Sequence, residues 1–180
     1  MQRHARGFTL VELMIGLVII AVLMLLAAPT LSTMRGNGRI RNTAESISHG
    51  MKLAQVEAIR RNTCVELAVI PVTGWEIRAL DTCVAPGAAT VLQQEPFATT
   101  NVVVDVNPPG ATMLTYSGMG AYVDPNPSDA SAPITFVDVT SPTTPNQKEL
   151  RVVVGPLLGQ AVKICDPDFT VVADPVFGCP

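Results

Sequence analysis

The chain has 180 residues, enough for one domain with an appendage, and its 48% hydrophobic and 15% charged residues exclude a disordered polyelectrolyte. Its formal net charge of −3 gives no overall attraction to nucleic acid or anionic lipid. Only two histidines occur, His4 and His49, and this scarcity argues against general-base and metal chemistry, so we expect no enzyme, no cofactor and no metal site.

The N-terminal part of the chain contains one long apolar run, Phe8–Leu31. As a helix, this run would extend about 36 Å, which exceeds the roughly 30 Å hydrocarbon core of a bilayer. Arg3 and Arg6 precede the run and the next basic residue is Arg35, so the positive-inside bias keeps the start of the chain cytoplasmic and exports the rest. This pattern predicts a membrane segment or a targeting segment.

Glu12 bears on the choice between interpretations of this run. A secretory signal peptide would use Arg3 and Arg6 and a cut near 27–28, but Pro29 would then follow the cut directly. Neither a signal peptide nor an ordinary single-pass anchor has a use for Glu12, because a carboxylate in hydrocarbon costs a few kcal/mol. An acid in this position is a functional hypothesis by default and requires a partner.

The segment Gly7–Glu12, which reads Gly-Phe-Thr-Leu-Val-Glu, resembles the processing site of type IV pilins and pseudopilins. The resemblance implies that a prepilin peptidase cuts between Gly7 and Phe8, on the cytoplasmic side of the bacterial inner membrane, and methylates the new terminal amine. It also implies that Glu12 pairs with the N-terminal amine of a neighbouring subunit during assembly. Such pairing would remove two uncompensated charges from a low-dielectric environment.

A helix is expected to continue beyond the apolar run, with two weak points. Pro29 should kink or loosen it, because the ring removes a backbone donor, and Gly36-Asn37-Gly38 is a second weak point, with a complete break as one outcome. Apolar residues then recur at steps of four and three and predict an amphipathic helix from about 40 to 62, packed on a domain: Ile40, Ala44, Ile47, Met51, Ala54 and Ala58. We expect the residues off this stripe to be solvated: Arg41, Glu45, Ser48, Lys52 and Gln55.

The other polar residues of the helix have several interpretations. Those just past the apolar run are expected to reach lipid headgroups or contact neighbouring subunits: Arg35, Arg39 and Arg41. A solvated helix face is an equally good interpretation for Lys52, Arg60 and Arg61. His49, the single histidine that would remain after processing, is expected at the surface or at its boundary.

After residue 62 the pattern changes to short β-rich runs, and the chain's 15 prolines and 13 glycines favour frequent turns. Cys64–Ile70 and Trp75–Leu80 flank Pro71-Val72-Thr73-Gly74, which predicts a hairpin. A second hairpin is expected around 155–159, between Glu149–Val154 and Gln160–Cys165. Other expected strands are Asn101–Val106, Thr112–Tyr116 and Ile134–Val139, with loops at 124–133 and 140–147.

Seven strands and one helix predict an α+β fold: a long N-terminal helix, membrane-spanning and then amphipathic, packed on an antiparallel β-sheet or sandwich. The resulting division of the chain is a leader (1–7), a transmembrane assembly helix (8–31), its amphipathic continuation (32–62) and a β-rich periplasmic domain (63–180).

Three further segments narrow the resemblance to the FimT/GspH group, which contains minor type IV pilins and minor pseudopilins: 54–62, 151–156 and 163–167. The resemblance implies an inner-membrane, single-pass minor pilin, a structural subunit involved in pilus assembly or initiation, whose partners are other pilins. The alternative is a minor pseudopilin of the type II secretion system, which supports protein export.

All four cysteines lie in the part predicted to be exported, and they form no CxxC pair. Zinc or thioredoxin-like chemistry is therefore not expected, and an even count in an oxidising compartment favours disulfides. Folding the first hairpin about its turn places residue 64 opposite roughly residue 81, close to Cys83. Of the three possible connectivities we expect Cys64–Cys83 and Cys165–Cys179, with buried free thiols as the alternative.

Calcium and DNA are the two ligands that the sequence weakly suggests. Asp124, Asn126, Ser128 and Asp129 bring oxygen ligands together, but the loop lacks the glycine and the bidentate glutamate of a calcium loop. A proline-rich surface loop is the plainer interpretation.

FimT-like minor pilins of naturally competent bacteria bind DNA through a basic Gly-Arg-x-Arg stretch, and the matching segment here is Gly159-Gln160-Ala161-Val162-Lys163, without either arginine. From Cys64 onward four basic residues stand against twelve acidic ones, a balance of −8. Such a domain repels duplex DNA. Nucleic acid is therefore not expected as a partner, and Lys163 is the candidate contact of the second alternative, a DNA-uptake pilin.

Overall fold

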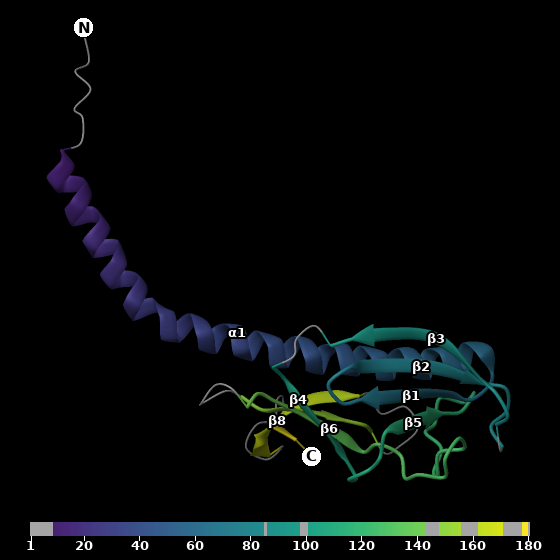
Figure 1. Cartoon of the computed structure of the whole chain (residues 1–180). Coiled ribbons are helices and arrows are strands. Elements are labelled where there is room, and N and C mark those ends of the chain that lie inside the picture. Colours follow the sequence, from purple (N-terminus) through teal and green to yellow (C-terminus); the bar gives the residue numbers. More distant parts are fainter. Residues whose placement is uncertain are drawn as a thin grey trace, which may run out of the picture.

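The structure is a computed structural model, which describes residues 9–84, 86–97, 101–142, 148–155, 162–170 and 178–179, apart from the side chains of 26–31 and 170. A single long helix, α1 (Leu10–Arg61), is followed by β-strands. The strands are β1 (Val65–Ile70), β2 (Gly74–Leu80), β3 (Ala89–Pro96), β4 (Val103–Asn107), β5 (Met113–Tyr116), β6 (Phe136–Thr140), β7 (Leu150–Val153), β8 (Lys163–Thr170) and β9 (Gly178–Cys179). The N-terminal half of α1 projects away from the strands, and its C-terminal half lies along them (Figure 1).

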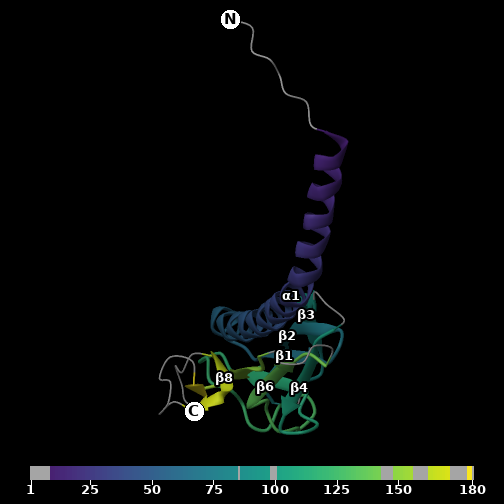
Figure 2. The same cartoon turned by 90° about the vertical axis from the view of Figure 1, so that its left-hand side faces the viewer.

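Helix α1 runs without interruption from Leu10 to Arg61, so the break considered at Gly36–Gly38 does not occur. Each glycine weakens a helix by about 1 kcal/mol. Gly36 is buried, however, and from Ile40 onward one face of the helix packs on the strands, and such packing outweighs propensity. The two halves of the helix point in different directions, as both views show (Figures 1 and 2). The helix ends at Asn62, whose left-handed backbone (φ 51°, ψ 40°) is a common helix stop.

The predicted apolar stripe of α1 is confirmed as the face that packs on the strands. Its six members are at most 1% exposed: Ile40, Ala44, Ile47, Met51, Ala54 and Ala58. Arg41, Glu45 and Lys52 are exposed as expected, and Gln55 is half-buried. The expectation that Ser48 is solvated is wrong: it is 3% exposed. The buried face is wider than the stripe and also includes Thr43, which is 4% exposed.

The strands form two sheets, and α1 packs on strands of both. The first sheet has the order β3-β2-β1-β5 and is antiparallel throughout. The second sheet has the order β4-β6-β7-β8-β9, with β9 running parallel to β8 and the other pairs antiparallel. This arrangement confirms the predicted α+β class, a long helix on antiparallel sheets, except for the parallel pair at the C-terminus.

Each predicted strand overlaps an observed one, with displaced ends, and the β1–β2 hairpin is confirmed. Its register differs by one residue from the predicted one: Val65 lies opposite Ala79, and the Leu80 amide donates to the Cys64 carbonyl at 2.9 Å. Strand β3 was not predicted. It is an edge strand with mostly exposed side chains, so it carries no clear alternation of apolar and polar residues.

Candidate functional site

The first turn of α1 is capped by Thr9. The Thr9 backbone is extended, and its hydroxyl oxygen accepts a hydrogen bond from the amide of Glu12 at 3.2 Å. Threonine followed three residues later by glutamate is the pattern of a helix-capping box, a local signal in the sequence for this cap. Glu12 itself is exposed and lies at the positive end of the helix dipole, which favours a carboxylate. The predicted processing residues, Gly7 and Phe8, lie outside the described residues.

The N-terminal half of α1 exposes apolar side chains all around its circumference. Every large apolar side chain from Leu10 to Leu25 is between 51% and 76% exposed. Glu12 is the single charged side chain of this stretch. The transmembrane segment 8–31 stays a prediction: within the described residues, no helix is long and apolar enough to cross a membrane.

The four cysteines form two bonds in the structure. Cys64 is bonded to Cys83 and Cys165 to Cys179, each pair with Cα atoms 5.2 Å apart. The first bond joins the base of the β1–β2 hairpin to the segment after it, and the second joins β8 to β9. Both bonds therefore connect strands near their ends, which is typical of structural disulfides.

The loop suggested as a calcium site uses its polar groups internally. Asn126 is fully buried, and its amide oxygen accepts from the backbone and the hydroxyl of Thr115 at 3.1 and 2.9 Å. Its amide nitrogen donates to the carbonyl of Met113 at 3.1 Å. Ser128 donates to the buried carboxylate of Glu66 on β1. Asn126 and Ser128 therefore fasten the loop to the first sheet, and no motif or periodicity in the sequence indicated these long-range contacts.

The basic residues of the β domain have partners of their own. Arg151 contacts Asp138 through two nitrogens, at 2.6 and 2.8 Å, and Lys163 donates to the carbonyl of Gly178 at 2.9 Å. Among the described residues, Arg78 also pairs with Glu66 at 2.6 Å and with Glu76 at 3.5 Å, and Lys148 pairs with Asp166 at 3.7 Å. Phosphate binding needs cations that can exchange counterions for phosphate, so in the described part of this domain Lys163 is poorly placed for DNA. Residues 159–161 of the stretch compared with DNA-binding pilins lie outside the described residues.

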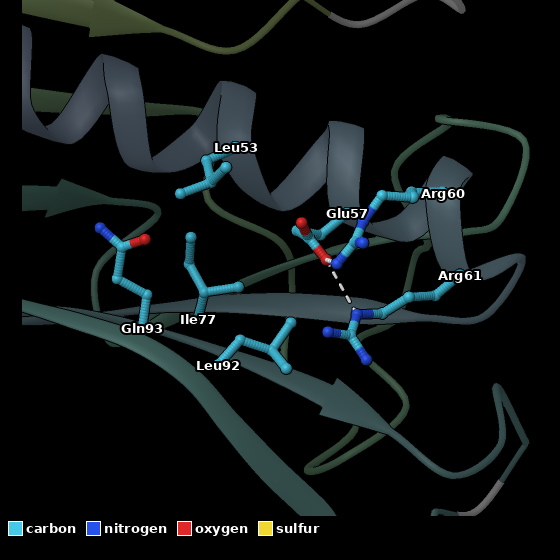
Figure 3. A pocket seen from close by; sticks show the side chains of 7 residues that line it. All are labelled: Leu53, Glu57, Arg60, Arg61, Ile77, Leu92 and Gln93. Carbon is cyan, nitrogen blue, oxygen red and sulfur yellow. Dashed lines mark hydrogen bonds and ion pairs between the residues drawn. The ribbon is translucent and has the colours of Figure 1, made fainter.

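A small cavity of about 170 Å³ lies between the end of α1 and strands β2 and β3 (Figure 3). Leu53, Ile77 and Leu92 give it apolar walls. At its rim, Arg60 and Arg61 lie 2.7 and 2.8 Å from the Glu57 carboxylate, and their hydrogen bonds hold the pKa of Glu57 below its usual value. The two arginines share this one carboxylate, and the residues that line the cavity bring no nucleophile together with a base.

Metal ligands do not gather elsewhere in the described residues, where no three His, Cys, Asp or Glu side chains are arranged to hold an ion. His49 lies exposed on α1. The features that remain for a function are therefore the free apolar half of α1 and the acid in its first turn.

Comparison with known proteins also points to the N-terminal half of α1. The family described as the prokaryotic N-terminal methylation motif matches residues 2–28, and the family described as type II transport protein GspH matches residues 43–159. The chain belongs to the GspH family. This GspH-family protein is thus a type IV pilin-like protein with a prepilin-type N-terminus.

Among solved structures, the type IV minor pilin FimU of Pseudomonas aeruginosa matches with a TM-score of 0.49 and 15% sequence identity, over 72% of this chain and 89% of that one. A search of the curated proteins finds no match.

Proposed function

We propose that this GspH-family protein is a minor type IV pilin, made as a precursor and anchored in the bacterial inner membrane by the single segment 8–31, with its β domain in the periplasm. A prepilin peptidase removes residues 1–7, and the mature chain then joins a pilus through its N-terminal helix. The observation that carries the proposal is the free half of α1, where large apolar side chains are exposed on every side around one carboxylate, Glu12.

Packing among several helices of this kind buries apolar area and favours close van der Waals contact. Glu12 then requires compensation, because an unpaired carboxylate between apolar helices is costly. Cleavage after Gly7 creates a new amine at Phe8, four residues before Glu12 in the sequence. The amine of one subunit next to the carboxylate of another cancels both charges and fixes the axial register of the two helices.

A variant of Glu12 tests this role. Glu12→Ala should be cleaved and recovered with membranes as the wild type is, but it should be missing from filaments sheared from the cell surface. The control is Glu45→Ala, which removes an exposed acid of the same helix that is paired with Arg41 at 2.8 Å; it should enter filaments normally. Recovery of Glu12→Ala in filaments at the wild-type level would refute the role. Mass analysis should show a methylated Phe8 as the first residue, and another first residue would refute the processing step.

A minor pseudopilin of a type II secretion system is the second candidate, and the family's description as a type II transport protein favours it. Both candidates use the same helix packing and differ in the assembly that the protein joins. Deleting the gene separates them: loss of surface pili or twitching motility supports the pilin, and retention of exported enzymes inside the periplasm supports the pseudopilin.

A further inference from the structure

We propose that Arg35 and Arg39 form an arginine face on α1 that binds the phosphate of anionic phospholipid headgroups where the helix leaves the membrane. This inference rests on the proposed membrane anchoring by residues 8–31. It assigns a lipid partner to two residues that neither the fold nor the assembly contact of Glu12 uses.

The first observation is that, in the part of the chain that the structure describes, these two arginines have no ion-pair partner while the other arginines of α1 do. Arg41 lies 2.8 Å from Glu45, and Arg60 and Arg61 lie 2.7 and 2.8 Å from Glu57. Arg35 and Arg39 are exposed, and neither has a carboxylate within ion-pair distance among the described residues. The sequence holds no acidic residue between Glu12 and Glu45, so α1 offers no nearby acid to either.

The second observation is their position along the helix. Arg35 and Arg39 lie four and eight residues beyond the end of the apolar run, which is about 6 and 12 Å along a helix axis. Side chains on a helix lean toward its N-terminus, so both arginine side chains leave the helix in the direction of the apolar half. The polar layer of a bilayer is about 5–7 Å thick on each side, and long arginine side chains starting at these heights can reach it.

The third observation is their mutual geometry. Residues four apart lie on one face of a helix, with Cβ atoms about 5–6 Å apart. A guanidinium group binds phosphate oxygens through two parallel hydrogen bonds, so the two side chains can hold one phosphate between them. Gly38 beside them adds no side chain and has open space around it, which leaves room for a headgroup.

Anionic lipid fits this face better than an acidic protein does, because the face directly continues the apolar run. The β domain has a balance of −8 from Cys64 onward and is repelled by an anionic surface. Lipid binding through Arg35 and Arg39 would therefore be local to the turns of α1 that hold them.

The full-length protein, reconstituted in vesicles of phosphatidylcholine with added phosphatidylglycerol, provides the test. Spin-labelled forms of the two lipids report which one is enriched next to the protein. We expect the wild type to prefer phosphatidylglycerol by about fivefold for each arginine near the surface, and we expect high salt to reduce this preference. The double variant Arg35→Gln, Arg39→Gln should lose the preference. The control variant Arg60→Gln, Arg61→Gln removes the same amount of charge far from the apolar run and should keep the preference for phosphatidylglycerol.

An equal preference in the wild type and in the Arg35→Gln, Arg39→Gln variant would overturn the inference. If that variant also lost a protein that co-purifies with the wild type, the face would belong to a protein contact instead. The anchoring itself is tested separately in vesicles of pure phosphatidylcholine. Insertion there, together with no lipid preference in the mixed vesicles, refutes only the arginine face, whereas failure to insert into either kind of vesicle refutes the anchor.

Discussion

A glycine-to-alanine exchange at Gly50 tests how tightly α1 packs on the first sheet. A Cβ atom added to Gly50 would lie 2.9 and 3.0 Å from two ring carbons of Trp75 and 3.2 Å from a methyl group of Leu67. The indole ring cannot easily retreat, because it is 2% exposed and its Nε1 donates to the hydroxyl of Ser46 at 2.9 Å. Gly50→Ala should therefore force the helix and the sheet apart.

The magnitude follows from a comparison within the same helix. Gly38 has no atom within 4 Å of its added Cβ, so Gly38→Ala should raise the free energy of unfolding by about 1 kcal/mol through helix propensity. Gly50→Ala has the same gain, but overpacking a filled core costs about 1–3 kcal/mol. We therefore expect the Gly50→Ala protein to be less stable than the Gly38→Ala protein by about 1–3 kcal/mol.

Urea titrations of the full-length proteins in mild detergent can measure this difference. Trp75 is the one tryptophan of the chain, so its fluorescence reports unfolding at the contact itself, and Gly50→Ala should also shift the emission of the folded state. The reasoning is refuted if the Gly50→Ala protein is as stable as the Gly38→Ala protein and its emission is unchanged.

Three other predictions concern the β domain. Asn126→Ala should lower the free energy of unfolding by about 3 kcal/mol, because it leaves the buried amide and hydroxyl of Thr115 without their acceptor; an unchanged urea midpoint would contradict this. Replacing Cys165 and Cys179 by serine should cost about 3 kcal/mol in the chain-entropy view, and the difference from the wild type should vanish when both are measured in reductant. Burial, followed by the charge of Asp138, raises the pKa of Glu149, so the folded state disfavours the ionised carboxylate. The resulting loss of stability is absent in acid and appears as the pH rises through the carboxyl range. Glu149→Gln should thus be more stable than the wild type in urea at neutral pH and equal to it near pH 3; the same difference at both pH values would be inconsistent with this cause.

Periodicity made the helix and its buried face predictable. The stripe from Ile40 to Ala58 repeats every three or four residues because one face of a helix packs on a sheet. The β1–β2 hairpin was predictable for a similar reason, since its turn residues separate two β-rich runs. Local weak points were less informative: Gly36 and Gly38 lie inside a helix that packing holds together.

Contacts between distant segments had no such signal. Glu66 alternates with apolar residues in β1, which is typical of a solvent-facing position, yet it is 1% exposed. The loop that carries Asn126 and Ser128 covers that face of the sheet. Loops have no periodic pattern of apolar residues, so their packing cannot be predicted in this way. Arg78 and Ser128 supply the partners that Glu66 needs there. The cap at Thr9 differs from these contacts, because the spacing of Thr9 and Glu12 is a local signal for it.

The continuity of α1 has a mechanical consequence. A filament under tension pulls on the N-terminal end of each subunit, and from Leu10 onward one uninterrupted helix connects that end, through the bend between its two halves, to the residues that pack on the sheets. Axial load would pass directly into the contact between Ile40–Ala58 and the strands, where it acts as shear spread over five helical turns. A subunit built in this way resists extraction with its whole core at once rather than yielding one contact at a time.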